Sequence, residues 1–203
     1  IYTVYKDVPI TENLRLIRKL FPERKKVVFL THWNLIGVEL KRIAEAERKN
    51  FPDLKIYVPD NAKMSTSEML GYIDELGDGV VVLYYSWYNK YAVNAASLQF
   101  LMNALGNNPK TPLLVMHTAL LRYGTVGGYM VSGKELGSRL AETVRRLVDD
   151  GDLPDRSVSA NTVDHAFYIN YPMLNFYNIH ESAIPKDAVI VGKESDVNTF
   201  EKY

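Results

Sequence analysis

The chain has 203 residues, 47% of them hydrophobic, which is enough for a substantial core in one large or two small domains. Its 24 Lys and Arg residues balance its 24 Asp and Glu residues, so no net charge favours nucleic acid or an anionic membrane as a partner. The lack of cysteine excludes disulfides, thiolate catalysis and thiolate metal ligands. No apolar run reaches the ~18 residues of a membrane span, and because the first residue is Ile1 we expect a processed or partial chain.

Helix and strand patterns alternate from the start of the chain. Apolar spacing predicts an amphipathic helix that begins after Thr11 and stops at Pro22. The continuous apolar run at 27–30 is typical of a strand buried on both faces, and a second strand is predicted at 54–58. Between them, Asn34 can cap a helix. The residues expected on the inner face of that helix are Ile36, Leu40, Ile43 and Ala44.

The middle of the chain continues the alternation. Ser65 and Glu68 have the spacing of a capping box, in which each side chain accepts a hydrogen bond from an otherwise unpaired backbone amide. A strand at 80–85, a helix at 98–105 and a strand at 113–116 are predicted next. Alternating helices and buried strands predict a three-layer α/β fold, flavodoxin-like, with a doubly wound and mostly parallel sheet.

A glycine-rich loop at 124–128 comes next, followed by a short predicted strand at 128–131. Glycines allow backbone to come close to a neighbour or a ligand. A second amphipathic helix is expected from about Lys134 to near 151–154. The apolar residues on its expected inner face are Leu136, Leu140, Val144 and Leu147.

The last part of the chain has shorter elements. We predict a strand at 166–170, a helix at 172–177 and a strand at 188–191 within a C-terminal loop. The sequence shows no internal repeat. We therefore expect one α/β lobe over 1–203, with its core at about 11–180 and a tail at 181–203.

Polar and aromatic residues follow the predicted strands at the points where each strand ends. Ligands of open α/β sheets bind beyond the carboxyl ends of the strands. Flat apolar walls with a few hydrogen-bonding groups suit a small molecule. The expected ligand-binding residues are Thr31, His32, Trp33, Asn34, Ser86, Trp87, Tyr88, His117, Gly124 and Gly127.

Catalytic and metal patterns are weak. The sequence has no G-x-S-x-G elbow, which argues against Ser86 as a nucleophile. The four histidines show no i,i+3 or i,i+4 pairing, so we expect no metal site. We expect a domain that binds without catalysis and holds no cofactor. One alternative stays open, a flavin- or nucleotide-using enzyme on a flavodoxin-like sheet.

Two stretches resemble a known family. NLRLIRKLFP at 13–22, followed by the strand at 27–30, resembles the entry to the second lobe of ABC-transporter-type substrate-binding proteins with a type I periplasmic-binding fold. The glycine loop, the helix with Gly137 and GDLP at 151–154 resemble the late part of that lobe. The resemblance implies that a first lobe of about 100 residues or more is missing here, or that a second copy of the domain takes its place as a homodimer.

The C-terminal part resembles a narrower group. LNFYNIHESAIPKDA at 174–188 is similar to the segment that closes the extracytoplasmic sensor region of certain bacterial histidine kinases and diguanylate cyclases, although Asn178 and Asp187 stand where that group has Gly. FEKY at 200–203 resembles the juxtamembrane end of such sensors. The resemblance implies a periplasmic small-molecule sensor in a membrane-anchored signal-transduction protein, such as a two-component histidine kinase. The alternative is a soluble substrate-binding component of an ABC transporter.

Overall fold

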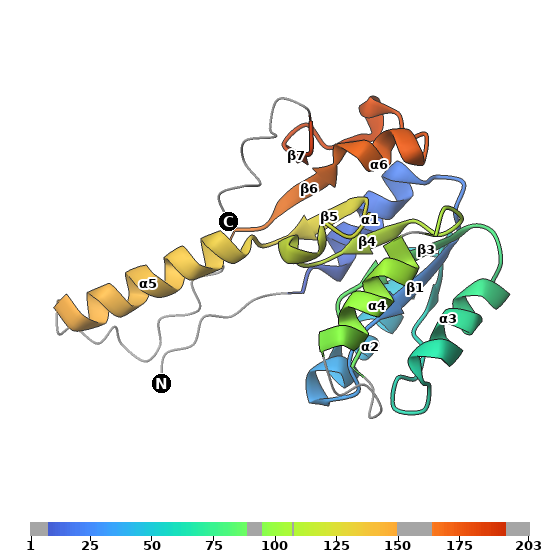
Figure 1. Cartoon of the computed structure of the whole chain (residues 1–203), viewed down its shortest axis with the longest axis horizontal. Coiled ribbons are helices and arrows are strands. Elements are labelled where there is room, and N and C mark those ends of the chain that lie inside the picture. The colour runs from blue at the N-terminus through green and yellow to red at the C-terminus, as the bar shows by residue number, and fades with distance from the viewer. Residues whose placement is uncertain (1–7, 89–94, 107, 150–163, 194–203) are drawn as a thin grey trace.

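The computed structural model describes residues 8–88, 95–106, 108–149 and 164–193. Its centre is a seven-stranded sheet with the order β2-β1-β3-β4-β5-β6-β7 (Figure 1). The strands are β1 (Lys26–Leu30), β2 (Lys55–Tyr57), β3 (Val80–Tyr84), β4 (Leu113–Val115), β5 (Gly127–Met130), β6 (Ala166–Asn170) and β7 (Val189–Val191). The α-helices are α1 (Ile10–Leu20), α2 (Leu35–Ala46), α3 (Thr66–Glu75), α4 (Ala95–Gly106), α5 (Gly133–Asp149) and α6 (Tyr171–Phe176).

Strand pairing is parallel from β2 to β5. β6 pairs antiparallel with β5, and β7 pairs parallel with β6. The predicted α/β fold with a mostly parallel, doubly wound sheet is confirmed. The antiparallel β5–β6 pair was not predicted.

Helices cover both faces of the sheet and create two separate cores. On one face, α1, α2 and α6 pack against β-strand residues such as Phe29 and Leu83. On the other face, α3 and α4 pack against residues such as Val28 and Val82. Neighbouring residues of a strand therefore enter different cores, which explains why the central strands are apolar throughout.

The predicted caps are present. The Asn34 side chain accepts a hydrogen bond from the backbone N of Gly37 (3.1 Å) at the start of α2. Ser65 and Glu68 form the reciprocal capping box of α3. One expectation for α2 was wrong, because Ile36 is exposed and only the later apolar residues of that helix face the sheet.

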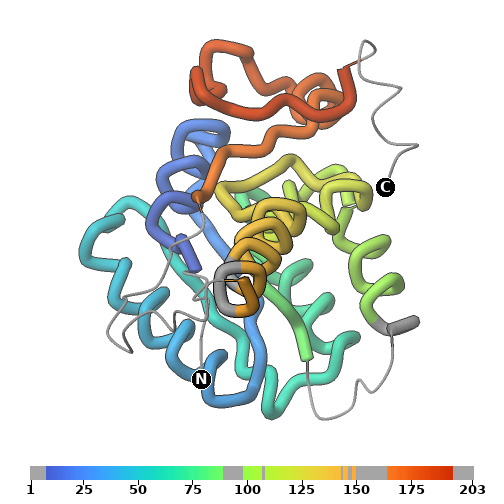
Figure 2. Tube along the Cα trace, turned by 90° about the vertical axis from the view of Figure 1, so that its left-hand side faces the viewer, coloured from blue at the N-terminus to red at the C-terminus, as the bar shows by residue number. Residues whose placement is uncertain are grey.

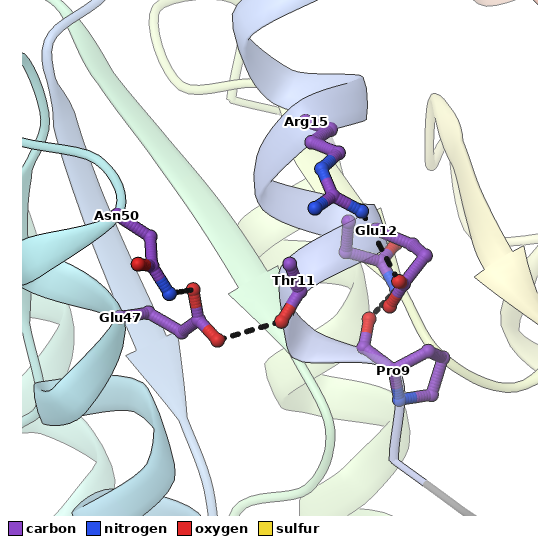
Figure 3. A network of polar contacts seen from close by, with 7 residues as sticks. Pro9, Thr11, Glu12, Arg15, Glu47 and Asn50 are labelled. Atoms are coloured by element: carbon purple, nitrogen blue, oxygen red, sulfur yellow. Dashed lines mark hydrogen bonds and ion pairs between the residues drawn. The ribbon is translucent and has the colours of Figure 1, made fainter.

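The α1 helix is fixed to the sheet by a buried asparagine that sequence analysis did not single out. The Asn13 side chain donates to the carbonyl oxygens of Pro9 (2.8 Å) and Tyr129 (2.9 Å), and it accepts from the Tyr129 backbone N (2.9 Å). It thus satisfies backbone groups of β5 as a neighbouring strand would. On the opposite side of α1, Thr11 donates to Glu47 (2.7 Å), which also accepts from Asn50 (Figure 3).

The α5 helix departs from the layered arrangement. It extends away from the sheet in Figure 1 and points toward the viewer in Figure 2. The expectation that its apolar face packs inside the lobe was wrong at Leu140 and Val144, which are exposed, as is Val148. The side chain of Leu147 lies outside the described part of the chain. The predicted features at 151–154 and 200–203 lie outside the described residues. None of the helices in the described ranges is long and apolar enough to cross a membrane.

Candidate small-molecule site at the carboxyl edge of the sheet

The strands β1 and β3 end side by side at the point where the strand order of the sheet reverses. β2 lies on one side of β1, whereas β3 lies on its other side, so β1 and β3 flank the switch point of the strand order. Ligands of such sheets bind at this switch point. Leu30 pairs with Tyr84, and its carbonyl accepts from the backbone N of Tyr85 (3.0 Å) and Ser86 (3.2 Å). These hydrogen bonds keep the residues that follow β1 next to the residues that follow β3 at the same edge of the sheet.

A cluster of polar and aromatic side chains occupies this position. The His32 Nδ1 and Ser86 Oγ atoms lie 2.7 Å apart and share a hydrogen bond. The His32 ring meets the Tyr85 ring edge-to-face at 5.2 Å and stacks with the Tyr88 ring at 6.0 Å. The Tyr85 ring lies 5.2 Å from the ring of His117, which follows β4. We call these five residues the edge cluster.

The loop that carries His32 is held by several local contacts. A Cβ atom on Gly37 would overlap the carbonyl oxygen of His32, so only glycine allows α2 to start this close to the loop. The Asn34 cap closes the same turn. The buried Asn61 side chain donates to the backbone carbonyl of Thr31. His32 is therefore positioned by backbone packing as well as by its own side-chain contacts.

Desolvation favours the uncharged forms of His32 and Tyr85 in the edge cluster. Desolvation lowers the pKa of His32 below its ordinary value. It raises the pKa of Tyr85. At neutral pH the imidazole of His32 is then neutral, with one donor and one acceptor nitrogen. These rings therefore suit a ligand that offers a flat surface and uncharged hydrogen-bonding groups.

Two buried polar atoms beside the edge cluster have no hydrogen-bond partner in the part of the chain that the structure describes. They are Thr31 Oγ1 and Trp87 Nε1. Trp87 packs in the core with α3 and α4, and its backbone N donates to the Tyr84 hydroxyl (3.1 Å). A buried donor without an acceptor destabilises the folded chain. A ligand that offers an acceptor to such a donor would remove this penalty.

The outer rim of the site is aromatic. The side chains of Trp33 and Tyr88 are 53% and 54% exposed, respectively. Asn34, which was predicted as a ligand contact, has its side-chain oxygen engaged in capping α2. Thr31 and Trp87, by contrast, are buried.

Two of the predicted site residues lie away from the edge cluster. Gly124 has a φ of 68° and approaches the backbone of Gly106, at the end of α4. Gly127 begins β5, and a Cβ atom there would overlap the carbonyl oxygen of Tyr168 in β6. Packing within the lobe explains both glycines, and neither belongs to the site proposed below.

Sequence analysis did not select Tyr85, which lies at the centre of the edge cluster. The available signal was its position directly after a buried strand. Tyr84 enters one core, so the next residue must face the opposite side of the sheet. Tyr85 indeed packs against the other core and reaches both His32 and His117.

Other chemistries find less support among the described residues. There, no three His, Cys, Asp or Glu side chains gather as metal ligands. Ser86 and His32 form two parts of a nucleophile–base pair, but no carboxylate of the described part bonds to His32 as the third part of a triad.

No family model matches the chain, and no curated protein matches it. Solved structures do match. A ligand-free, open substrate-binding protein with adhesive properties from Clostridium difficile is 14% identical, with a TM-score of 0.59, 94% of this chain covered and 63% of that one. An ABC domain in complex with L-Trp from Streptococcus pneumoniae is 14% identical, with a TM-score of 0.65, 92% of this chain covered and 63% of that one.

A conserved domain protein from Vibrio cholerae is also 14% identical, with a TM-score of 0.65, 92% of this chain covered and 61% of that one. The chain therefore spans less than two thirds of the length of these structures. At this identity the likeness concerns the fold. The chain has the α/β fold of ABC-type substrate-binding proteins.

Proposed function

We propose that this chain is a non-catalytic, extracytoplasmic small-molecule-sensing domain of a membrane-bound signal-transduction protein. The observation that carries the proposal is the edge cluster, in which residues after β1, β3 and β4 meet at the switch point of the sheet. Its rings offer stacking surfaces, and the Ser86–His32 pair offers directed hydrogen bonds. This combination is typical of small-molecule sites.

Ligand binding would act by shifting a conformational equilibrium. A ligand that contacts both the edge cluster and an opposing body is bound best when the two are close together, so it increases the population of the closed arrangement. The residues beyond β7 would pass this change to a membrane helix of the parent protein.

The fold supports a binding protein, and two kinds of binding protein fit it equally well. A soluble substrate-binding component of an ABC transporter is the alternative to a sensor. The resemblance of 174–188 to the closing segment of bacterial sensor regions favours the sensor. The gene decides between them, because a sensor requires a membrane helix and an output domain downstream, such as a histidine kinase or a diguanylate cyclase.

A flavin- or nucleotide-using enzyme is a second alternative, because flavodoxin-like sheets hold FMN at the same switch point. Phosphate groups need cations or several free backbone amides. The five residues of the edge cluster supply rings and hydroxyl groups but no cation. A yellow protein after purification, or a retained nucleotide, would support the enzyme instead.

The test is a thermal-shift screen of the purified chain against a metabolite library. A true ligand at a hundredfold excess over Kd raises the free energy of unfolding by about 2.7 kcal/mol. Calorimetry then compares Tyr85→Leu and His32→Gln with Tyr72→Leu, a control in another aromatic pair, with Tyr57. We expect a loss of about tenfold or more in affinity for the first two, equivalent to 1.4 kcal/mol, and none for the control.

Equal losses for all three variants would place the ligand elsewhere. Turnover of a hit compound by the purified chain would replace sensing with catalysis.

A further inference from the structure

A second concave site lies apart from the edge cluster, beside the first turn of α1. It is a hollow of about 360 Å³, which falls within the usual size range of ligand pockets. Its lining comes from the start of α1 and the residues just before it, from Ile43 of α2, from Tyr129 of β5, and from His165, which precedes β6. None of the described lining residues belongs to the edge cluster. The two sites can therefore be tested separately.

The aromatic part of the lining is built by strand pairing. Tyr129 and Phe167 are direct partners in the antiparallel β5–β6 pair, and their ring centroids lie 4.5 Å apart. His165 lies two residues before Phe167, so its side chain leaves the sheet on the same side. Its ring stacks with that of Tyr129 at 5.6 Å. The Asn13 side chain fixes the backbone of Tyr129. The hollow is therefore bordered by an ordered and half-buried aromatic surface.

The polar part of the lining carries negative charge. Among the described lining residues, Glu12 supplies the one carboxylate, and none is Lys or Arg. Thr11 also lines the hollow, and its hydroxyl donates to a second carboxylate, that of Glu47 (2.7 Å, Figure 3). Glu12 lies in the first turn of α1 and already supplies the negative charge that a helix N-terminus favours. An anionic ligand would therefore meet repulsion here.

One side chain competes for the Glu12 carboxylate. The Arg15 Nη1 atom lies 3.3 Å from Glu12 Oε1, but the Arg15 side chain is 66% exposed. Exposed ion pairs of this kind contribute little free energy. A ligand cation inside the hollow would be better shielded from water, and its attraction to the carboxylate would be stronger there.

We propose that this hollow binds a small organic cation of the primary alkylammonium class. The ammonium group would donate hydrogen bonds to the Glu12 carboxylate and lie against the Tyr129 ring, whose π-electrons attract a cation. Pro9 and Ile43 would contact the alkyl body of the ligand. The site goes beyond the proposed function and does not depend on it, because it uses no residue of the edge cluster.

The test titrates the purified chain with isopentylammonium chloride at constant ionic strength and follows the backbone amide signals by NMR. Isopentyl alcohol is the matched neutral probe, because it keeps the alkyl body and lacks the charge. We expect the ammonium compound to shift the signals of Glu12 and Tyr129 saturably and to bind about tenfold more tightly than the alcohol. Equal affinities, no saturable shift, or shifts confined to Ser86 and His117 would overturn the proposal.

Charge-matched variants then locate the cation. Glu12→Gln keeps the size of the side chain and removes its charge, so it should weaken binding of isopentylammonium about tenfold. Glu39→Gln is the control, because Glu39 forms the same kind of exposed i,i+3 pair with Arg42 (2.6 Å) and does not line the hollow. It should leave the affinity unchanged. Equal losses for the two variants would assign the effect to net charge and contradict the proposal.

Arg15→Gln gives a measurement that does not depend on how well Glu12→Gln folds. The substitution changes an exposed side chain and removes the cation that competes for Glu12. We expect binding of isopentylammonium to become about twofold tighter or more. Unchanged or weaker binding would show that the Glu12 carboxylate does not hold the ligand.

Discussion

The α1 and α5 helices have the same amphipathic design, yet one is covered and the other is not. Ile17 and Leu14 of α1 are 0% and 1% exposed, whereas Val144 and Val148 of α5 are 57% and 75% exposed. α1 lies on the sheet, and the Asn13 side chain holds it to β5 through two hydrogen bonds with Tyr129. α5 extends away from the sheet (Figure 1). The difference shows that an apolar helix face predicts burial but does not identify what buries it.

The largest test of this comparison truncates one residue in each helix. Ile17→Ala should lower the free energy of unfolding by about 2–5 kcal/mol, because it leaves a cavity in a closed core. Leu140→Ala should lower it by no more than about 0.5 kcal/mol, as is usual for a surface position. Urea unfolding followed by circular dichroism measures both. Similar losses for both variants would mean that α5 is packed within this lobe.

Asn13 provides the next largest effect. Asn13→Ala removes the side chain that bonds to both the backbone N and O of Tyr129. We expect the free energy of unfolding to fall by about 2–4 kcal/mol. Asn50→Ala, which removes an exposed hydrogen bond to Glu47, should cost less than about 1 kcal/mol. Chemical denaturation measures the free energy of unfolding of both variants. A smaller loss for Asn13→Ala than for Asn50→Ala would show that the position of α1 does not depend on the hydrogen bonds of Asn13.

Gly37 and Gly71 are two helical glycines with different surroundings. Gly37→Ala should destabilise the chain by about 1–3 kcal/mol, because the new methyl group overlaps the His32 carbonyl and displaces the loop. Gly71→Ala in α3, where a Cβ atom meets nothing within 4 Å, should instead stabilise the chain by about 0.5–1 kcal/mol. The two Tm values should therefore move in opposite directions, and a shared direction would refute the close approach at Gly37.

The smallest effect concerns pH. The pKa of His32 is lowered by burial, so the unfolded chain binds the proton more readily than the folded one. The stability that neutral His32 contributes is fully present above its ordinary pKa of 6.5 and is lost as the pH falls through the lower folded value. His32→Gln should flatten the pH dependence of the urea midpoint below pH 6.5. An unchanged slope would show that His32 is not desolvated.

Much of the fold could be predicted because buried strands and helix caps leave local signals. The strand at 166–170 and the capping box of Ser65 and Glu68 were placed correctly. Strand direction leaves no such signal, so the antiparallel pairing of β6 was missed. Ile36 and the apolar face of α5 were expected in the interior, but Ile36, Leu140 and Val144 are exposed. Periodicity shows which residues share a helix face, but it does not show what packs against that face.

The site was predictable in part for the same reason. Residues that directly follow parallel strands meet at one edge, which brought His32, Ser86 and His117 into consideration. Tyr85 was overlooked because it falls within the predicted strand at 80–85, and only residues beyond the predicted strand ends were selected. Gly127 was taken as a ligand contact, although its missing side chain makes room for the β6 backbone, which lies close only in the folded chain.

The last described strand, β7, lies several strands away from Ser86, which follows β3. β7 has three residues and, among the described strands, pairs with β6 alone, at the far end of the sheet from β2. Four strand spacings separate β3 from β7, which amounts to about 19 Å. A ligand held beside Ser86 therefore lies beyond direct contact with β7. In the proposed sensor, binding would reach β7 only through β4, β5 and β6, so the stiffness of these three strands would matter for output rather than for binding.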